Sequence, residues 1–188
     1  TENVSKGIGV KSLRKRHLTE REIREIGAKR HLTKYPDIAL MTERLARKAA
    51  AEPKFRFYRL FWWITHEQTL RCAWERVRAN GGAPGVDGVT FQMIERSEGG
   101  VDGFLAGLQK ELRENAYRAS PLRRKYIEKA NGKLRPLGIP TIKDRVVQAA
   151  LKLIVEPIFE ADFHDCSYGF RPNRNAKMAV ERIAAEIK

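Results

Sequence analysis

The sequence is poor in the residues that build disulfide frameworks and zinc sites. Its 188 residues include two cysteines, Cys72 and Cys166, and four histidines, and no Cys-x-x-Cys pair occurs. Zinc sites and small disulfide-rich folds need several such side chains at short spacings. We therefore expect no metal site built from cysteine and histidine. The two isolated thiols favour a reducing compartment, with Cys72 as a core thiol.

Long apolar runs and an excess of acidic residues are also missing. The most hydrophobic stretch, residues 61–64, is far shorter than the run of about 18 residues that indicates a membrane-spanning helix. We therefore expect no membrane partner. The 37 Lys and Arg residues outnumber the 23 Asp and Glu residues, which gives a net charge of +14. A merely solvated surface would mix both signs, so this excess predicts an anionic partner such as a nucleic acid.

The hydrophobic pattern predicts a mostly α-helical chain with one small β-hairpin, an α+β fold. Helix starts are indicated by Thr19 with Glu22, by Thr65 with Gln68, by Thr90, and by Thr141 with Asp144 in place of glutamate. A helix that begins at Thr141 is apolar on most sides, which indicates burial. The predicted helices cover residues 19–30, 36–52, 65–79, 90–97, 104–116, 141–156 and 174–188.

The segment 55–64 is dense in aromatic residues interleaved with Arg56 and Arg59. Aromatic side chains beside arginine can stack on nucleic-acid bases. The same residues at helical spacing more often form core, and we interpret them as core. The two helices before this segment could pack on the rest of the chain, bind RNA or mediate self-association, and the sequence does not choose.

Residues 122–139 have the pattern of a strongly basic β-hairpin. Asn131-Gly132 is the dipeptide preferred by a type I′ turn, in which both central residues need a positive φ. Only Glu128 opposes the basic residues of this segment, which are Arg123, Arg124, Lys125, Lys129, Lys133 and Arg135. Such a hairpin predicts binding to a polyanion, either a triphosphate or a nucleic-acid backbone.

A glycine-rich loop spans residues 80–90, and its backbone can approach a ligand closely and present N–H groups to phosphate. Asp87 within it could be mistaken for a catalytic carboxylate. We expect Asp87 to order the loop by bonding its own backbone. His164 and Asp165 lack a third ligand nearby, so we interpret them as surface-loop residues.

The glycine-rich loop and, after it in the chain, the segment that begins at the hairpin turn resemble the fingers of reverse transcriptases from bacterial group II introns and of their retron and maturase relatives. The matching stretches are residues 80–90, 132–148, 156–159 and 167–172. The likeness extends over roughly residues 55–188. It implies the fingers subdomain of a right-hand polymerase without most of the palm. Residues 1–54 would be a basic N-terminal extension with an arm and two helices. Residues 55–121 would be the helical first part of the fingers, and residues 122–188 the hairpin, the buried helix and the start of the palm.

The resemblance also implies which residues contact substrates. Those expected to bind the incoming nucleotide are Arg123, Arg124, Lys129, Tyr168, Gly169, Phe170 and Arg171. Those expected to contact template and primer are Gly81, Gly82, Gly85, Val86, Gly88, Lys133, Arg135 and Lys143. Relatives often have proline beside the lysine at the end of the first strand, whereas this chain has Glu128 and Ala130 around Lys129.

The Tyr-x-Asp-Asp turn that carries catalytic carboxylates in this family is not found in the sequence. We therefore expect no catalytic residue here, and we expect Mg²⁺ to be held by palm residues outside this chain. The resemblance then implies the N-terminal portion of an RNA-directed DNA polymerase, which is located in the bacterial cytoplasm and is inactive as this fragment.

The expected partners of this polymerase are an RNA template, a DNA or RNA primer, dNTP and structured intron RNA. Self-association through Met178, Val180 and Ile183 is also plausible. The alternative is a non-catalytic RNA-binding or oligomerisation module that reuses the fingers fold.

Overall fold

The computed structural model describes residues 18–27 and 32–187, so the predicted basic arm at residues 1–17 lies outside the described residues. Within them the fold is mostly helical, with one two-stranded antiparallel sheet, as the α+β prediction requires. The helices are α1 (Glu20–Gly27), α2 (Pro36–Ala51), α3 (Leu60–Ile64), α4 (Glu67–Asn80), α5 (Phe91–Glu95), α6 (Gly100–Arg113), α7 (Ile142–Asp162) and α8 (Ala176–Glu186). The strands are β1 (Arg123–Glu128) and β2 (Leu134–Ile139).

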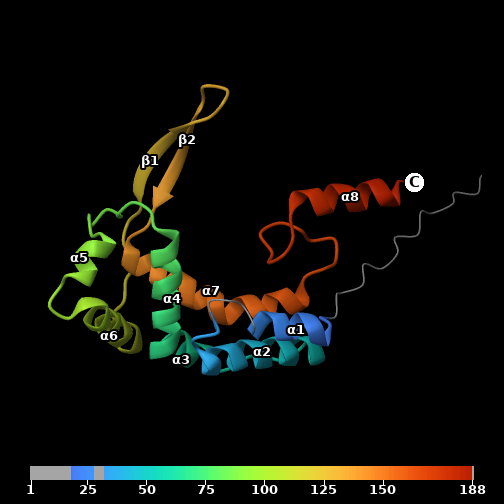
Figure 1. Cartoon of the computed structure of the whole chain (residues 1–188), viewed down its shortest axis with the longest axis horizontal. Helices are drawn as coiled ribbons and strands as arrows, with labels where there is room; N and C mark the ends of the chain where they lie inside the picture. Colours follow the sequence, from blue (N-terminus) through green and yellow to red (C-terminus); the bar gives the residue numbers. More distant parts are fainter. Residues whose placement is uncertain (1–17, 28–31, 188) are drawn as a thin grey trace, which may run out of the picture.

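Helix α7 runs through the middle of the molecule, and α2, α3 and α4 pack against it (Figure 1). Its first half, with Val146 and Ala150, lies in the main core together with residues of α4, α5 and α6. Leu153 packs with Ile38 and the buried Cys72 in a second cluster. Ala161 packs against α1 and α2 in a third. The two N-terminal helices therefore pack on the rest of the chain.

Three helix starts that were predicted from capping residues are confirmed. The backbone N–H of Thr19 donates to the Glu22 carboxylate at 2.9 Å, and the N–H of Glu22 donates back to the Thr19 hydroxyl at 3.3 Å. Thr90 Oγ1 accepts from the N–H three residues later at 3.2 Å. Thr141 Oγ1 accepts from the N–H of Asp144 at 3.1 Å. Each bond satisfies a donor that the first helical turn leaves unpaired. The start predicted at Thr65 is wrong, because α4 begins at Glu67 without a side-chain cap and the Thr65 hydroxyl donates to the Trp62 carbonyl at 3.2 Å.

The prediction that the buried helix ends before Pro157 is wrong, because α7 continues through this residue to Asp162. Proline lacks the N–H that would bond the carbonyl of Leu153, and a proline inside a helix costs about 3 kcal/mol. Pro157 itself is buried, and so are Ile154 and Ala161 on either side of it. Burial of this helix against its neighbours offsets the local cost.

The hairpin of β1 and β2 projects away from the helices (Figure 1), and nearly all of its residues are exposed. Its tip is not the predicted type I′ turn, since only Gly132 has a positive φ, of 74°, and Asn131 does not. The N–H of Gly132 donates to the Lys129 carbonyl at 2.8 Å, and Lys129 donates to Lys133 at 2.9 Å. This is a three-residue loop closed by a left-handed glycine, which also joins antiparallel strands with the right twist.

The interpretation of residues 55–64 as core is wrong for most of their rings. Helix α3 spans only five residues, and it begins after Arg59, which has a φ of 62°. So short a helix presents one narrow side to the core. Ile64 is buried, and Phe57, Leu60 and Trp63 pack partly against the main cluster. The remaining aromatic side chains are exposed, namely Phe55, Tyr58, Phe61 and Trp62.

Helix α8 has no buried residue, and its side chains Met178, Val180 and Ile183 are exposed. Self-association through this face stays a prediction. In the described part of the chain, none of the helices combines the length and the apolar character needed to cross a membrane.

Candidate nucleic-acid interface

A groove of about 710 Å³ separates the hairpin from the glycine-rich loop. In an antiparallel pair, residues opposite each other share a face of the sheet. Lys125 pairs with Leu137 and Ile127 pairs with Arg135, so one face carries both apolar and basic side chains. The groove is lined from the hairpin by residues 125–128 and 137–139, which include one cation, Lys125, and one carboxylate, Glu128, and from the other side by Gly82, Ala83, Pro140 and Arg145. The basic hairpin and the glycine-rich loop are thus two walls of one concave surface.

Arg145 connects these two walls. Its Nη1 donates to the Gly81 carbonyl at 3.2 Å, and its Nη2 donates to the Ala83 carbonyl. Its Nε donates to the carbonyl of Pro140, just after β2, at 3.2 Å. Burial lowers the pKa of the Arg145 guanidinium, and the Asp87 carboxylate partly offsets this effect. Arg145 therefore fixes the loop relative to the end of the hairpin.

The glycine-rich loop also packs directly on the start of α7. Gly85 is buried, and a Cβ added there would lie 2.6 Å from Cα of Thr141, which is closer than real atoms come. Asp87 Oδ1 accepts a hydrogen bond from the N–H of Val89 at 3.2 Å. The prediction that Asp87 orders its own loop is confirmed. Val86 is left 55% exposed beside the groove wall.

A buried carboxylate holds the other end of the hairpin. Asp144 is 3% exposed, and it accepts hydrogen bonds from Tyr117 Oη at 2.5 Å and from the N–H of Ser120 at 3.2 Å. Burial, and then the hydrogen bond with Asp144, raises the pKa of Tyr117. The segment that enters β1 is thereby tied to the first turn of α7. Sequence reasoning missed Arg145 and Asp144 as organisers of this site, because their partners lie 24 to 64 residues away in the chain.

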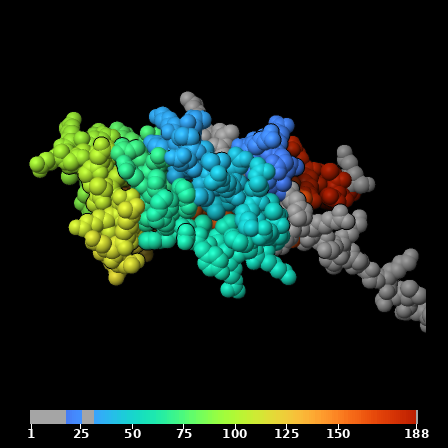
Figure 2. Space-filling view, turned by 90° about the horizontal axis from the view of Figure 1, so that it is seen from below, coloured from blue at the N-terminus to red at the C-terminus, as the bar shows by residue number. Residues whose placement is uncertain are grey.

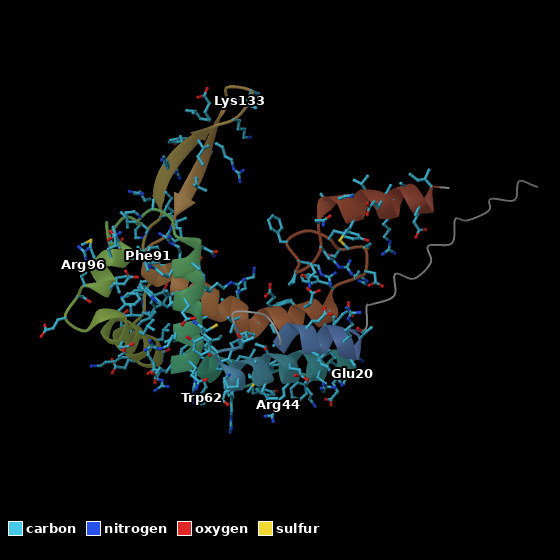
Figure 3. All side chains as sticks on the ribbon, viewed as in Figure 1. Glu20, Arg44, Trp62, Phe91, Arg96 and Lys133 are labelled. Carbon is cyan, nitrogen blue, oxygen red and sulfur yellow. The ribbon has the colours of Figure 1, made fainter. Side chains whose placement is uncertain are left out.

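The basic side chains of the hairpin differ from the lysine that follows it. Arg123, Arg124, Lys129, Lys133 and Arg135 are all exposed, and within residues 18–27 and 32–187 none of them has an ion-pair partner. Lys143, by contrast, donates to both oxygens of Glu111 at 2.7 and 2.8 Å and joins α7 to α6. The hairpin therefore presents uncompensated positive charge to solvent (Figure 3, near Lys133).

The loop after α7 is organised by two arginines that point into the protein. Arg171 is buried, and its guanidinium contacts both oxygens of Glu160, with Nη2 to Oε1 at 2.5 Å. It also donates to the carbonyls of His164 and Ser167, each at 3.0 Å. Arg174 donates to the same Ser167 carbonyl at 3.2 Å. These bonds hold the loop in a closed shape.

The tip of this loop faces outward. Phe170 is fully exposed and has a φ of 57°, which is uncommon for a residue with a side chain. Gly169 beside it is exposed as well, and Tyr168 is half-buried with its ring 5.0 Å from the Arg174 guanidinium. The loop thus presents Phe170 to the surroundings, while Arg171 is used for internal bonds.

The two groups of predicted nucleotide-binding residues lie at opposite ends of α7 (Figure 1). The hairpin precedes this helix and the loop of Tyr168 to Arg171 follows it. At 1.5 Å per residue, the 21 residues of α7 cover about 30 Å. Their assignment to one nucleotide pocket stays a prediction. Of the residues predicted to contact template and primer, Gly82 lines the groove, whereas Lys133 and Arg135 lie on the hairpin outside its lining.

Side chains that could hold a metal ion are not grouped in the described ranges, where no cluster of three or more His, Cys, Asp and Glu side chains is suited to one. His164 and Asp165 lie in the loop after α7. The binding of Mg²⁺ by palm residues stays a prediction, and no step through Mg²⁺ is assigned to the described residues.

No protein-family model matches the chain. The chain is 43% identical over 152 residues to protein YkfC of Escherichia coli K12, an alignment that covers 80% of this chain and 39% of YkfC. It is 32% identical over 153 residues to the group II intron-encoded protein LtrA of Lactococcus lactis, with 81% of this chain and 25% of LtrA covered. A 48-residue segment is 48% identical to nuclear intron maturase 1 of Arabidopsis thaliana, which is 26% of this chain and 7% of the maturase.

The chain thus spans well under half the length of the relatives it matches. The alignments with LtrA and with intron maturases agree with the likeness seen in the two sequence motifs. The predicted relationship is therefore confirmed, and the chain is a homologue of the group II intron-encoded proteins and intron maturases.

Proposed function

We propose that this chain is the N-terminal, fingers portion of an RNA-directed DNA polymerase of the group II intron type. It binds the primer–template and the incoming dNTP, and the catalytic aspartates and their Mg²⁺ lie outside this chain. The observation that carries the proposal is the groove between the basic hairpin and the glycine-rich loop. The group II intron-encoded relative LtrA supports the same assignment.

The hairpin supplies the contacts to phosphate. Arg123 and Arg124 lie at the start of β1 and Lys129 follows its end, so their exposed cations are free to bind the triphosphate. Charge-assisted hydrogen bonds of this kind are the strongest that side chains make to phosphate. Lys133 and Arg135 lie at the tip and the start of β2, where they reach the template backbone.

The glycine-rich loop and the loop after α7 complete the surface. Gly82, Val86 and Gly88 are exposed, and they let the template strand approach the backbone closely. Arg171 acts through Glu160 by holding the loop after α7 in shape, and Lys143 acts through Glu111 by joining two helices.

A salt titration of primer–template binding tests the proposal. We expect the chain of residues 1–188 to bind an RNA–DNA primer–template duplex with an affinity that falls as salt rises. The double variant Lys133→Ala/Arg135→Ala should weaken binding and lower the slope of log K against log salt by about 2, since each lost phosphate contact lowers it by about 1. Fluorescence anisotropy at several salt concentrations measures both quantities.

A matched control separates local contacts from net charge. Arg21→Ala/Arg47→Ala also removes two positive charges, from α1 and α2, where Arg21 pairs with Glu25, and Arg47 pairs with Glu20 and Glu43. We expect a clearly smaller change in slope for this control. Equal slopes for both double variants would contradict a binding site on the hairpin.

Primer extension with an RNA template, dNTPs and Mg²⁺ tests the polymerase assignment. We expect extension by a longer protein that contains the chain, and no extension by residues 1–188 alone. Extension above background by the 188-residue chain would show that the catalytic carboxylates are present in it.

The maturase names among the relatives favour one alternative, a non-catalytic RNA-binding module that keeps the fingers fold. It predicts the same salt-dependent RNA binding. The two functions differ in one result, because under the alternative neither the longer protein nor the 188-residue chain extends a primer.

A further inference from the structure

A second surface has the side chains of a nucleic-acid site and lies away from the groove. We call it the aromatic–arginine surface. It consists of Phe55, Arg56, Tyr58, Arg59, Phe61 and Trp62. Trp62 belongs to α3 and lies on the side of the molecule opposite the hairpin tip with Lys133 (Figure 3). Figure 2 views the molecule from below, and the segment coloured between cyan and green lies on that face.

The aromatic side chains of this surface are exposed far more than a core would allow. Phe55 is 41% exposed, Tyr58 75%, Phe61 51% and Trp62 50%. Isolated exposed apolar side chains are normal on a protein surface, but here four large aromatic side chains are exposed within eight residues. Such a concentration marks an interaction site.

Neighbouring rings hold two of these side chains in place. The Trp62 ring lies 4.8 Å from the Trp63 ring and 5.0 Å from the His66 ring, measured between centroids. The Phe55 ring lies edge-on to Phe57 at 5.1 Å, and Lys48 Nζ lies 4.3 Å from its centroid. Rings fixed before a ligand arrives lose little conformational freedom on binding. The exposed faces are therefore ready to take a planar partner.

The charge of this segment is of one sign. Residues 53–66 contain Lys54, Arg56 and Arg59 and no carboxylate. Among the residues that the structure describes, none of these three cations has an ion-pair partner. Arg59 also has a φ of 62°, a conformation that is uncommon for a residue with a Cβ. The segment thus offers unneutralised positive charge between its rings.

We propose that the aromatic–arginine surface binds single-stranded RNA, with unpaired bases stacked on Tyr58 and Trp62 and phosphates contacted by Arg56 and Arg59. Stacking on aromatic rings is tolerant of sequence, because every base has a flat π face. The surface is distinct from the groove, so one chain can hold a primer–template and an unpaired RNA segment together. The choice of RNA over DNA rests on the proposed function.

A second copy of this chain is the main competing occupant, and the charge disfavours it. In a two-fold symmetric dimer the same patch meets itself. Lys54, Arg56 and Arg59 of one copy would then lie close to the same three cations of the other, with no carboxylate of residues 53–66 to compensate them. A polyanion carries the complementary charge.

The test uses the 188-residue chain and a fluorescein-labelled 12-nucleotide oligouridylate, which has no stable secondary structure. We expect Tyr58→Ala/Trp62→Ala to weaken binding about tenfold or more, because each stacked base contributes about 1–3 kcal/mol. Trp62→Phe keeps a ring and should lose much less. Phe159→Ala removes an aromatic side chain that is 56% exposed on α7, outside this surface, and should bind as the unaltered chain does. Circular dichroism of each variant verifies that the helices are retained.

Tryptophan fluorescence gives a second readout that does not depend on affinity. Stacking of a base on Trp62 should quench the emission at saturating oligouridylate, and this quenching should be smaller in Trp62→Phe. Unchanged affinity and unchanged quenching in the ring variants would overturn the inference. Dissociation of a dimer by Tyr58→Ala/Trp62→Ala in analytical ultracentrifugation, without any change in RNA binding, would overturn it in favour of a second copy.

The hairpin variant Lys133→Ala/Arg135→Ala separates this inference from the proposed function. If the hairpin variant loses primer–template binding while the ring variants bind oligouridylate normally, the hairpin stands as the primer–template site and the aromatic–arginine surface does not stand. If only the ring variants lose RNA binding, the second surface stands and the hairpin fails as the primer–template site.

Discussion

The hairpin and the loop after α7 both carry arginines and differ in how they use these cations. Both are rich in arginine, and both are expected from the family likeness to touch the incoming nucleotide. The hairpin holds Arg123 and Lys129 on an exposed sheet with no ion-pair partner in the described ranges. The loop turns Arg171 inward onto Glu160 and two carbonyls.

A basic residue in a motif can therefore contact the ligand or build the surface that the ligand meets. The distinction depends on whether a carboxylate lies within reach. Glu160 precedes Arg171 by 11 residues on the last turn of α7, and the loop folds back onto it. Glu128 is the one carboxylate among six cations in the hairpin, and its neighbours are left without partners. Four predictions sharpen this comparison or break it.

Arg171→Ala should have the largest effect, and that effect is on stability. The substitution removes the buried guanidinium that pairs with the Glu160 carboxylate and bonds two loop carbonyls, and breaking a buried pair in this way costs about 3–5 kcal/mol. Urea unfolding followed by circular dichroism measures the change. Arg123→Ala, which breaks no described ion pair, should alter the free energy of unfolding by less than about 0.5 kcal/mol. Similar stabilities for the two variants would show that the comparison is wrong.

Gly85→Ala should destabilise the chain by about 2 kcal/mol. The added methyl group would lie 2.6 Å from Cα of Thr141, so the loop or the start of α7 must shift, and overpacking of this kind costs about 1–3 kcal/mol. Gly107→Ala in α6 is the control, since its added Cβ meets nothing within 4 Å. The control should be neutral or slightly stabilising, because alanine favours helix more than glycine does. A Gly85→Ala protein as stable as the control would mean that the loop does not pack closely on α7.

Arg123→Ala/Lys129→Ala should raise the apparent KM for dNTP about tenfold in a longer, active protein that contains this chain. Loss of charge-assisted bonds to phosphate costs about 1.5–3 kcal/mol when such bonds are well formed, and exposure reduces this. The Kd for primer–template should change less, because Lys133 and Arg135 are retained. Steady-state kinetics with varied dNTP measures the effect. An unchanged KM for dNTP together with weaker primer–template binding would place these residues on the template instead.

Local patterns predicted the helix starts and the existence of the hairpin. Thr19 with Glu22, and Thr141 with Asp144, carry their signal within four residues, and the structure shows the bonds. The Asn131-Gly132 pair marked the turn correctly, although its geometry is that of a longer loop. Signals of this kind depend on neighbours in the chain, and so they are visible in one sequence.

Long-range packing decided what the sequence could not. Continuation of α7 through Pro157 depends on the burial of this helix against its neighbours, which overrides the local preference of proline. The role of Arg145 depends on carbonyls of the glycine-rich loop 62 and 64 residues away. The exposure of Tyr58 and Trp62 depends on how little of α3 faces α7, which the aromatic pattern alone does not reveal.

Tyr117→Phe should have the smallest effect, and its pH dependence makes it specific. The variant keeps the ring and loses the hydrogen bond to Asp144, at a cost of about 1 kcal/mol near neutral pH. Burial and the Asp144 carboxylate raise the pKa of Tyr117 above its ordinary value of 10.0. The raised pKa of Tyr117 adds stability that is fully present below pH 10, where the tyrosine is protonated in both states. This stability is lost as the pH rises through the folded-state pKa, because the tyrosine of the unfolded chain ionises first. The gap between the unaltered chain and Tyr117→Phe should therefore shrink from pH 8 to pH 11. A constant gap would show that Tyr117 ionises equally in both states, and that Asp144 does not hold the base of the hairpin through this hydroxyl.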